Sequence, residues 1–290
     1  MSRPGLLGVS LGGPMSGRTR YAEAMSLYQS GQISAAQLEA YRVAAASDHS
    51  PPDLVFAERD LPLPDLPIHR TANTPCLRAL QHLLDEADRY LCTLAGPGIQ
   101  EVRQGIARHR YGAMTHEPVG QSPVLDQHLP TALAGMYKTH PSLAAAITDA
   151  AIHLNWVTYD GFDPDQIGPD YGKSHAYASL LGEEAAIAAE DFDFGLFLIA
   201  PHVLYRDHNH AAPELYAPLT GPHGWRFGPD LPLIIKPAHN PIWNPAYQSH
   251  LIKVGPTPFL CFFGWTRDVQ PMAKILPAKD WPALEALRLT

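Results

Sequence analysis

Side chains that can bind a metal ion or transfer a proton recur at even spacings in one short segment between apolar runs. They are His208, His210, Glu214 and Tyr216. Successive side chains of an extended chain point to opposite faces, so an extended backbone would present all four on one face. Neutral imidazole nitrogens and a carboxylate oxygen are groups that divalent first-row metals bind. The spacing therefore predicts strand structure around a metal-binding face.

A further histidine lies on a second predicted strand, where His250, Ile252 and Val254 share one face. A barrel with this face turned inward would bring His250 opposite the first cluster. Three nitrogens and one carboxylate, with positions left for other ligands, are typical of an open catalytic metal site. The candidate ligands are His208, His210, Glu214 and His250. His239 competes with His250 for the fourth place.

The chain changes character near residue 156. Before it, apolar residues recur at helical spacing, whereas after it short apolar or alternating runs are separated by glycine and proline, which favours a small barrel or sandwich. A proline-rich stretch over 48–75 reads as an extended connector. We expect helices over 21–29, 34–46, 75–94, 99–109, 129–140 and 141–154, and strands over 176–181, 194–200, 214–219, 231–235, 249–254 and 259–265. The expected regions are a partly helical or extended stretch (1–73), a helical region (74–155), a β-barrel (156–270) and a C-terminal tail (271–290).

Composition excludes several classes of function. A formal net charge of -8 without a run of lysine or arginine argues against nucleic acid as a partner. No apolar run approaches the roughly 20 residues that cross a bilayer, so we expect no membrane span. Cys76, Cys92 and Cys261 are widely spaced, which makes a disulfide framework unexpected and the cytoplasm the expected location. The sequence is that of a globular protein with a small-molecule partner, and it leaves a homodimer open.

The pattern His208-x-His210-x3-Glu214-x6-Gly221, followed by Pro245-x4-His250, resembles the two metal-binding motifs of the cupin superfamily. Tyr205, Asp207 and Tyr216 narrow the likeness to the cupin-type dimethylsulfoniopropionate lyases of bacteria. The likeness covers about residues 140–268. It implies an α+β fold, in which a helical N-terminal region is followed by a C-terminal double-stranded β-helix barrel.

The resemblance also implies chemistry. One divalent transition metal ion (zinc, iron, manganese, nickel or cobalt) would be held by the four candidate ligands, with Tyr216 as the catalytic base and Tyr205 holding the substrate. That substrate is a small zwitterion, which β-elimination splits into dimethyl sulfide and acrylate. A sulfonium cation has no N–H donors and is best held by aromatic faces, so Tyr247, Trp225 and Trp243 are the expected substrate-binding residues. The competing interpretation places these aromatic residues in the barrel core, and Tyr216 among its buried tyrosines.

Two other functions are compatible with the same residues. An iron site of three histidines and one glutamate also suits an oxygen-dependent dioxygenase acting on another small organic acid. A non-catalytic cupin that binds a small ligand is the second alternative. That role leaves Tyr216 without a task, and the sequence has no basic patch that would suit a regulator of transcription.

Overall fold

The computed structural model describes residues 17–46, 52–62, 75–110, 112, 120, 122–158, 163–229 and 231–290. The chain forms two compact units, Met1–Arg78 with Arg110–Met114, and Ala79–His109 with Thr115–Thr290. Expectations for residues 1–16 and 63–74 lie outside the described residues. The region boundaries expected from the sequence stay predictions.

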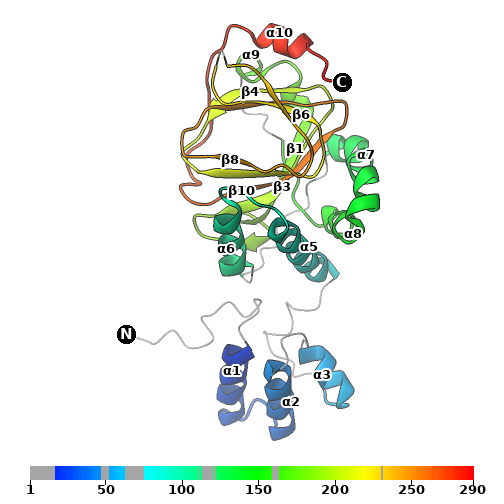
Figure 1. Cartoon of the computed structure of the whole chain (residues 1–290). Helices are drawn as coiled ribbons and strands as arrows, with labels where there is room; N and C mark the ends of the chain where they lie inside the picture. The colour runs from blue at the N-terminus through cyan, green and yellow to red at the C-terminus, as the bar shows by residue number, and fades with distance from the viewer. Residues whose placement is uncertain are drawn as a thin grey trace. The chain divides into compact units, whose positions relative to one another are not determined.

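The first unit contains three short helices, namely α1 (Gly17–Gln29), α2 (Ala35–Ala46) and α3 (Pro52–Glu58) (Figure 1). A capping box starts α2, because the Gln37 amide donates to Ser34 Oγ over 3.2 Å and the Ser34 amide donates to Gln37 Oε1 over 2.8 Å. Tyr41 and Phe56 meet edge to face in a small core of this unit's own. The expected extended connector is wrong over 52–58, where proline occupies the first helical turn and its missing N–H costs nothing.

Further helices precede and follow the strands. They are α5 (Pro75–Cys92), α6 (Ile99–His109), α7 (Pro123–Thr139), α8 (Pro141–Ala151), α9 (Pro164–Ile167), the 3₁₀ helix η2 (Tyr171–Lys173) and α10 (Trp281–Ala286). The helix expected over 129–140 begins earlier, because Pro123 lies in the first turn and the helix continues through Pro130. None of the described helices combines the length and the apolar character that crossing a bilayer requires.

The described strands form two separate sheets. They are β1 (His175–Gly182), β2 (Ile187–Ala188), β3 (Asp193–Ile199), β4 (Leu204–Asn209), β5 (Glu214–Pro218), β6 (His223–Arg226), β7 (Ile234–Lys236), β8 (Ile242–Asn244), β9 (His250–Lys253), β10 (Phe259–Trp265) and β11 (Lys274–Ile275). Sheet A has the order β2-β1-β3-β10-β5-β8 and sheet B the order β11-β4-β9-β6-β7. Their strands pair antiparallel, except for the short β1–β2 pair. Among the described residues this pairing does not close into one hydrogen-bonded barrel.

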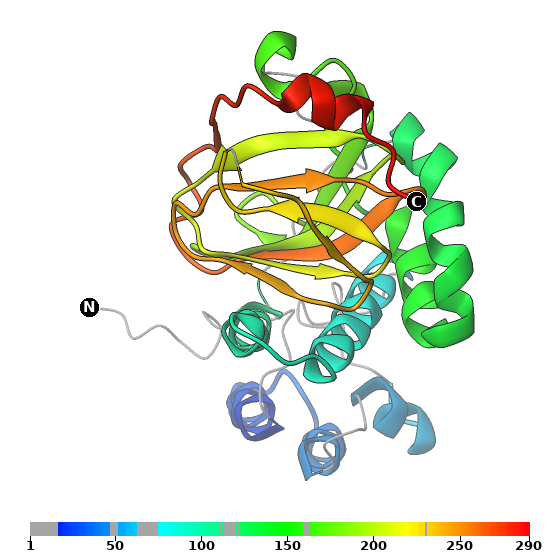
Figure 2. The same cartoon turned by 45° about the horizontal axis from the view of Figure 1, so that its top comes forward.

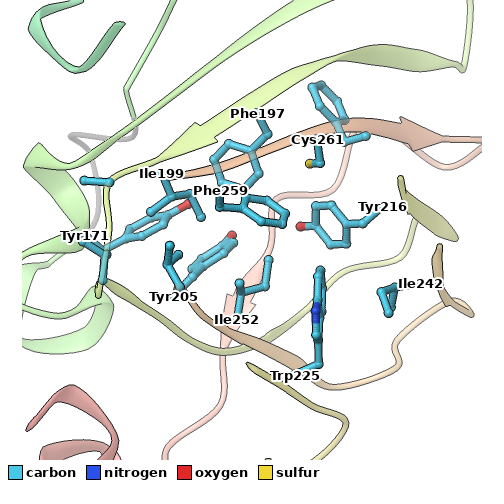
Figure 3. Packing of buried hydrophobic residues seen from close by; sticks show 14 of the residues in the cluster. Tyr171, Phe197, Ile199, Tyr205, Tyr216, Trp225, Ile242, Ile252, Phe259 and Cys261 are labelled. Carbon is cyan, nitrogen blue, oxygen red and sulfur yellow. The ribbon is translucent and has the colours of Figure 1, made fainter. Parts of the chain in front are cut away.

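Sheet A is buried on both faces, which explains why β3 and β10 read as continuous apolar runs. Its outer face packs against helices: Tyr90 of α5 lies 6.2 Å from the Phe262 ring, and Val102 of α6 packs over Gly264. A Cβ at Gly264 would lie 2.9 Å from Val102 Cγ2, so only glycine permits this approach. The inner faces of both sheets enclose an aromatic-rich core, part of which Figure 3 shows.

The C-terminal segment, expected as a tail, carries structure of its own. Strand β11 pairs with β4, and α10 lies over sheet B, where Figure 2 shows it on the outer side of the strands. Buried Arg226 forms ion pairs with buried Asp207 and with Asp280. The Trp281 indole N–H donates to Asp207 over 2.8 Å. Residues near the C-terminus therefore complete the pairing of two buried charges on sheet B.

Arg226→Met should destabilise the second unit by about 3–5 kcal/mol, because it leaves the Asp207 carboxylate buried without its cation. Guanidinium denaturation followed by tryptophan fluorescence measures the change. Arg267→Met is the matched control, since Arg267 is 54% exposed in its ion pair with Glu101, and a surface pair contributes at most about 1 kcal/mol. Equal losses in the two variants would contradict this account of sheet B.

Candidate metal centre

His208 and His250 face each other across two neighbouring strands. In the β4–β9 register these residues are direct partners, and their ring centroids lie 4.0 Å apart. Both are buried. Direct cross-strand partners point to the same face of a sheet, so the two imidazoles project together into the space between sheets A and B.

A β-bulge in β4 determines which of its other side chains face inward. The register shifts between Tyr205 and His208, which in a regular strand would point to opposite faces. Instead both face inward and stack, with ring centroids 3.9 Å apart. The two residues between them turn outward: Arg206 binds Glu285 of α10, and Asp207 binds Arg226. The same bulge therefore sets the outward contacts of Arg206 and Asp207 and the inward positions of Tyr205 and His208.

Glu214 comes from the opposite sheet. Its Oε2 lies 3.1 Å from His210 Nε2 and 3.2 Å from His250 Nε2, while Trp265 Nε1 donates to Oε1 over 2.8 Å. The expectation that these side chains share one face of a single strand is therefore wrong. Strand β4 ends at Asn209 and β5 begins at Glu214 in the other sheet, so the motif's polar groups meet across the interior rather than along one strand face.

Each imidazole is held in the same tautomer by a backbone carbonyl. His208 Nδ1 donates to Arg206 O over 2.8 Å, His210 Nδ1 to Ala212 O over 2.7 Å, and His250 Nδ1 to Gln248 O over 2.9 Å. A carbonyl oxygen only accepts, so in every case Nδ1 carries a proton and Nε2 is the nitrogen that faces the cluster. This second-shell pattern is typical of metal-binding histidines.

The charges of the cluster are strongly coupled. Burial lowers the pKa of His208 well below its usual value, and the neighbouring imidazoles add to the effect. Burial also opposes the charge of His210, but the Glu214 carboxylate outweighs it and the pKa of His210 is raised. Burial raises the pKa of Glu214, yet His210 and His250 outweigh it and hold that pKa below its usual range. The carboxylate is therefore ionised and His208 neutral, as metal ligands are.

These residues fit a divalent cation. Ligand atoms of His208, His210 and His250 lie within 4.8 Å of one another, and all three residues are buried. His250 Nε2 is close to Glu214 but has no hydrogen-bond partner among the described residues, a costly state for a buried nitrogen unless it binds something else. Asn244, the register partner of Glu214 on β8, is also buried with an amide that is unpaired among these residues. The donor set, three imidazole nitrogens and one carboxylate, suits a first-row transition metal.

A cavity of about 170 Å³ opens beside the cluster. Its size is comparable with the ~150 Å³ apolar cavity that accommodates benzene, so a small organic molecule fits. The lining residues are Tyr177, Asp193, Phe197, Tyr205, His208, His210, Glu214, Tyr216, Phe263, Trp265, Val269 and Ala273. The hydroxyl groups of Tyr205 and Tyr216 point toward the same part of the interior (Figure 3). Burial, followed by the Glu214 carboxylate, raises the pKa of both phenols.

The expected substrate-binding aromatics lie elsewhere. Trp225 is fully buried behind Tyr216, with ring centroids 5.6 Å apart, and Trp243 packs against Gly98. Tyr247 is 66% exposed, and its amide donates to His210 O over 2.8 Å. None of the three lines the cavity, so their assignment to substrate binding stays an untested prediction. His239 is also apart from the cluster, bonded through Nδ1 to the Tyr90 hydroxyl over 3.0 Å.

Sequence reasoning missed several polar residues that line the cavity, Trp265 and Asp193 among them. The signal for Trp265 was its alternation with Cys261 and Phe263 along β10, which places all three on the inner face. Asp193 begins an apolar strand, where a carboxylate more often marks a turn. Only the register of β3 against β10 places it beside the site.

A family model described as dimethylsulfoniopropionate (DMSP) lyase matches residues 98–261, more than half of the chain. The chain belongs to the DMSP lyase family. No curated protein matches the sequence.

Solved structures resemble this chain in fold. One, described as DMSP lyases RdDddP and RnDddQII, is 19% identical and covers 69% of this chain and 98% of its own, with a TM-score of 0.55. DMSP lyase DddQ from Ruegeria pomeroyi is 18% identical (70% and 98% covered, TM-score 0.48), and a cupin-like protein from Thermotoga maritima is 13% identical (36% and 77%, TM-score 0.32). The expected order of the fold, N-terminal helices followed by a C-terminal domain of mainly antiparallel sheets, is confirmed.

His208→Ala should weaken binding of Zn²⁺ or Mn²⁺ at least about tenfold, the low end of losses seen when a metal site is disturbed. Equilibrium dialysis followed by mass-spectrometric metal analysis measures it. His82→Ala is the control, because His82 is half exposed on α5. If His208→Ala bound metal as tightly as the control, the proposed donor set would be wrong.

Proposed function

We propose that the protein cleaves DMSP to dimethyl sulfide and acrylate by a metal-dependent β-elimination that Tyr216 initiates. The observation that supports this proposal most directly is the position of Tyr216, which lines the same cavity as His208, His210 and Glu214 and lies two residues beyond Glu214 on β5. Membership of the DMSP lyase family supports the substrate.

Four residues would hold the metal, namely His208, His210, Glu214 and His250. When bound, a divalent cation supplies a Lewis acid that makes the α-proton of a substrate carboxylate more acidic and favours the ionised form of a nearby phenol. The protein contributes the orientation of its ligands, since three backbone carbonyls and the Trp265 N–H fix the imidazoles and the carboxylate before any ligand enters.

Tyr216 removes the α-proton in this proposal. The electron pair of the broken C–H bond forms the double bond of acrylate, the bond between the β-carbon and sulfur breaks, and its electrons leave with neutral dimethyl sulfide. The proton stays on the phenol oxygen and passes to solvent before the next turnover. Burial and Glu214 raise the pKa of Tyr216 when no cation is present, so the unloaded protein should be inactive.

Tyr205 orients the substrate. Its ring is fixed between Tyr171, at 4.2 Å, and His208, at 3.9 Å. A ring clamped on both faces places its hydroxyl group reproducibly, and the raised pKa keeps that group protonated as a hydrogen-bond donor for a carboxylate.

An anaerobic assay separates elimination from the dioxygenase alternative. Metal-loaded protein incubated with DMSP under nitrogen should release equal amounts of dimethyl sulfide, measured by headspace gas chromatography, and acrylate, measured by liquid chromatography. Tyr216→Phe should lower the rate about 10²–10⁴-fold, the contribution of a positioned base, while metal content stays unchanged. Tyr137→Phe, which alters an exposed phenol on α7, is the control.

No dimethyl sulfide from fully metal-loaded wild type would refute DMSP as the substrate. Activity that needs oxygen would favour the dioxygenase alternative. An active Tyr216→Phe variant would remove the tyrosine from the mechanism while leaving the substrate in place. A cytoplasmic location and the absence of a nucleic-acid partner stay expectations from the sequence.

A further inference from the structure

Asp193 lines the same cavity as His208, His210 and Glu214. Across sheet A, Trp265 is the register partner of Asp193 on one side and of Glu214 on the other. Direct partners share a face, so the three side chains form one row on the inner face. Two strand spacings separate the ends of this row, which places the Cα atoms of Asp193 and Glu214 roughly 10 Å apart.

The Asp193 carboxylate has no counter-charge among the residues that the structure describes. Among the described residues, no lysine, arginine or histidine forms an ion pair with it, and its buried Oδ1 has no hydrogen-bond partner. Burial raises the pKa of Asp193 to about 7, against the opposing effect of the Ser179 hydroxyl. A carboxylate in such surroundings gains stability from any cation that enters the cavity.

One side of the Asp193 carboxylate packs against strand β1. A Cβ at Gly182 would lie 3.2 Å from Asp193 Oδ1, so the acid rests closely against the β1 backbone. Asp193 nevertheless keeps part of its surface accessible and lines the cavity. Tyr177, Phe263 and Trp265 line the same space.

We propose that Asp193 binds the cationic end of the substrate and so selects carboxylates that carry a fixed positive charge on the β-carbon. This assignment rests on the proposed function, because it takes the substrate carboxylate to be bound at the histidine cluster. A methylated sulfonium or ammonium has no N–H to donate, and a carboxylate among aromatic faces attracts such a cation through charge alone. The histidine cluster and Asp193 then hold the two opposite charges of one zwitterion.

Two ligands of equal shape test the charge. β-Alanine betaine carries a trimethylammonium group on the β-carbon of propionate, and 4,4-dimethylpentanoate has a neutral carbon in place of the nitrogen. Calorimetric titration of both ligands into metal-loaded wild type, Asp193→Asn and Glu190→Gln gives the ratio of the two Kd values in each protein. Glu190→Gln removes the same charge from an exposed residue nearby, so it is the matched control.

Wild type and Glu190→Gln should prefer the betaine. Asp193→Asn should lower that preference about tenfold, the loss expected for one partly buried charge pair, while its Kd for the neutral ligand and its metal content stay unchanged. Asp193→Ser provides a second variant with a smaller side chain and the same expected loss.

An unchanged ratio in both Asp193 variants would overturn the assignment, as would an equal loss of affinity for the two ligands. The experiment measures Kd values, so its result does not depend on whether the protein turns over a substrate. Charge selection that depends on Asp193 without any release of dimethyl sulfide would refute the lyase reaction but keep the assignment. Release of dimethyl sulfide with an unchanged ratio of Kd values would support the lyase reaction and refute the assignment of Asp193.

Discussion

Three hydrogen bonds, one from each imidazole Nδ1 to a backbone carbonyl, determine what the centre of this protein can do. They leave three Nε2 atoms facing one small volume, with Glu214 beside them. The backbone that supplies the carbonyls is fixed in turn by the β4–β9 register and by the bulge between Tyr205 and His208. The chemistry of the site therefore depends on the geometry of the main chain as much as on the choice of side chains.

The bulge connects the interior of sheet B to its surface. It turns Arg206 and Asp207 outward, where Glu285, Arg226 and Trp281 bind them. In this way α10, far from the site in sequence, supports the strand that carries Tyr205 and His208. The interior between the two sheets has two parts. An aromatic-rich core fills one part, and the row of Asp193, Trp265 and Glu214 on sheet A makes the other part polar.

Spacing in the sequence predicted the helices α5 and α6, the strand β10 and the candidate ligands of a metal, because helical and strand periods are local properties. It also predicted that His250 would lie opposite the first cluster inside a barrel, whereas the register places it directly beside His208 on the neighbouring strand. Local patterns gave a wrong reason for the convergence of His208 and Glu214, since they cannot show that a strand ends at Asn209 and resumes in another sheet. They missed Asp193 and α10 as well, because register and the pairing of distant charges are set only when the sheets assemble.

Crystals of the metal-loaded protein, measured at the absorption edge of the bound ion, test the account most directly. The anomalous difference map should show one strong peak within bonding distance of Nε2 of His208, His210 and His250 and of the Glu214 carboxylate, with every Nδ1 still bonded to its carbonyl. A peak bound through Nδ1, or one located outside this cluster, would contradict the assignment of the site.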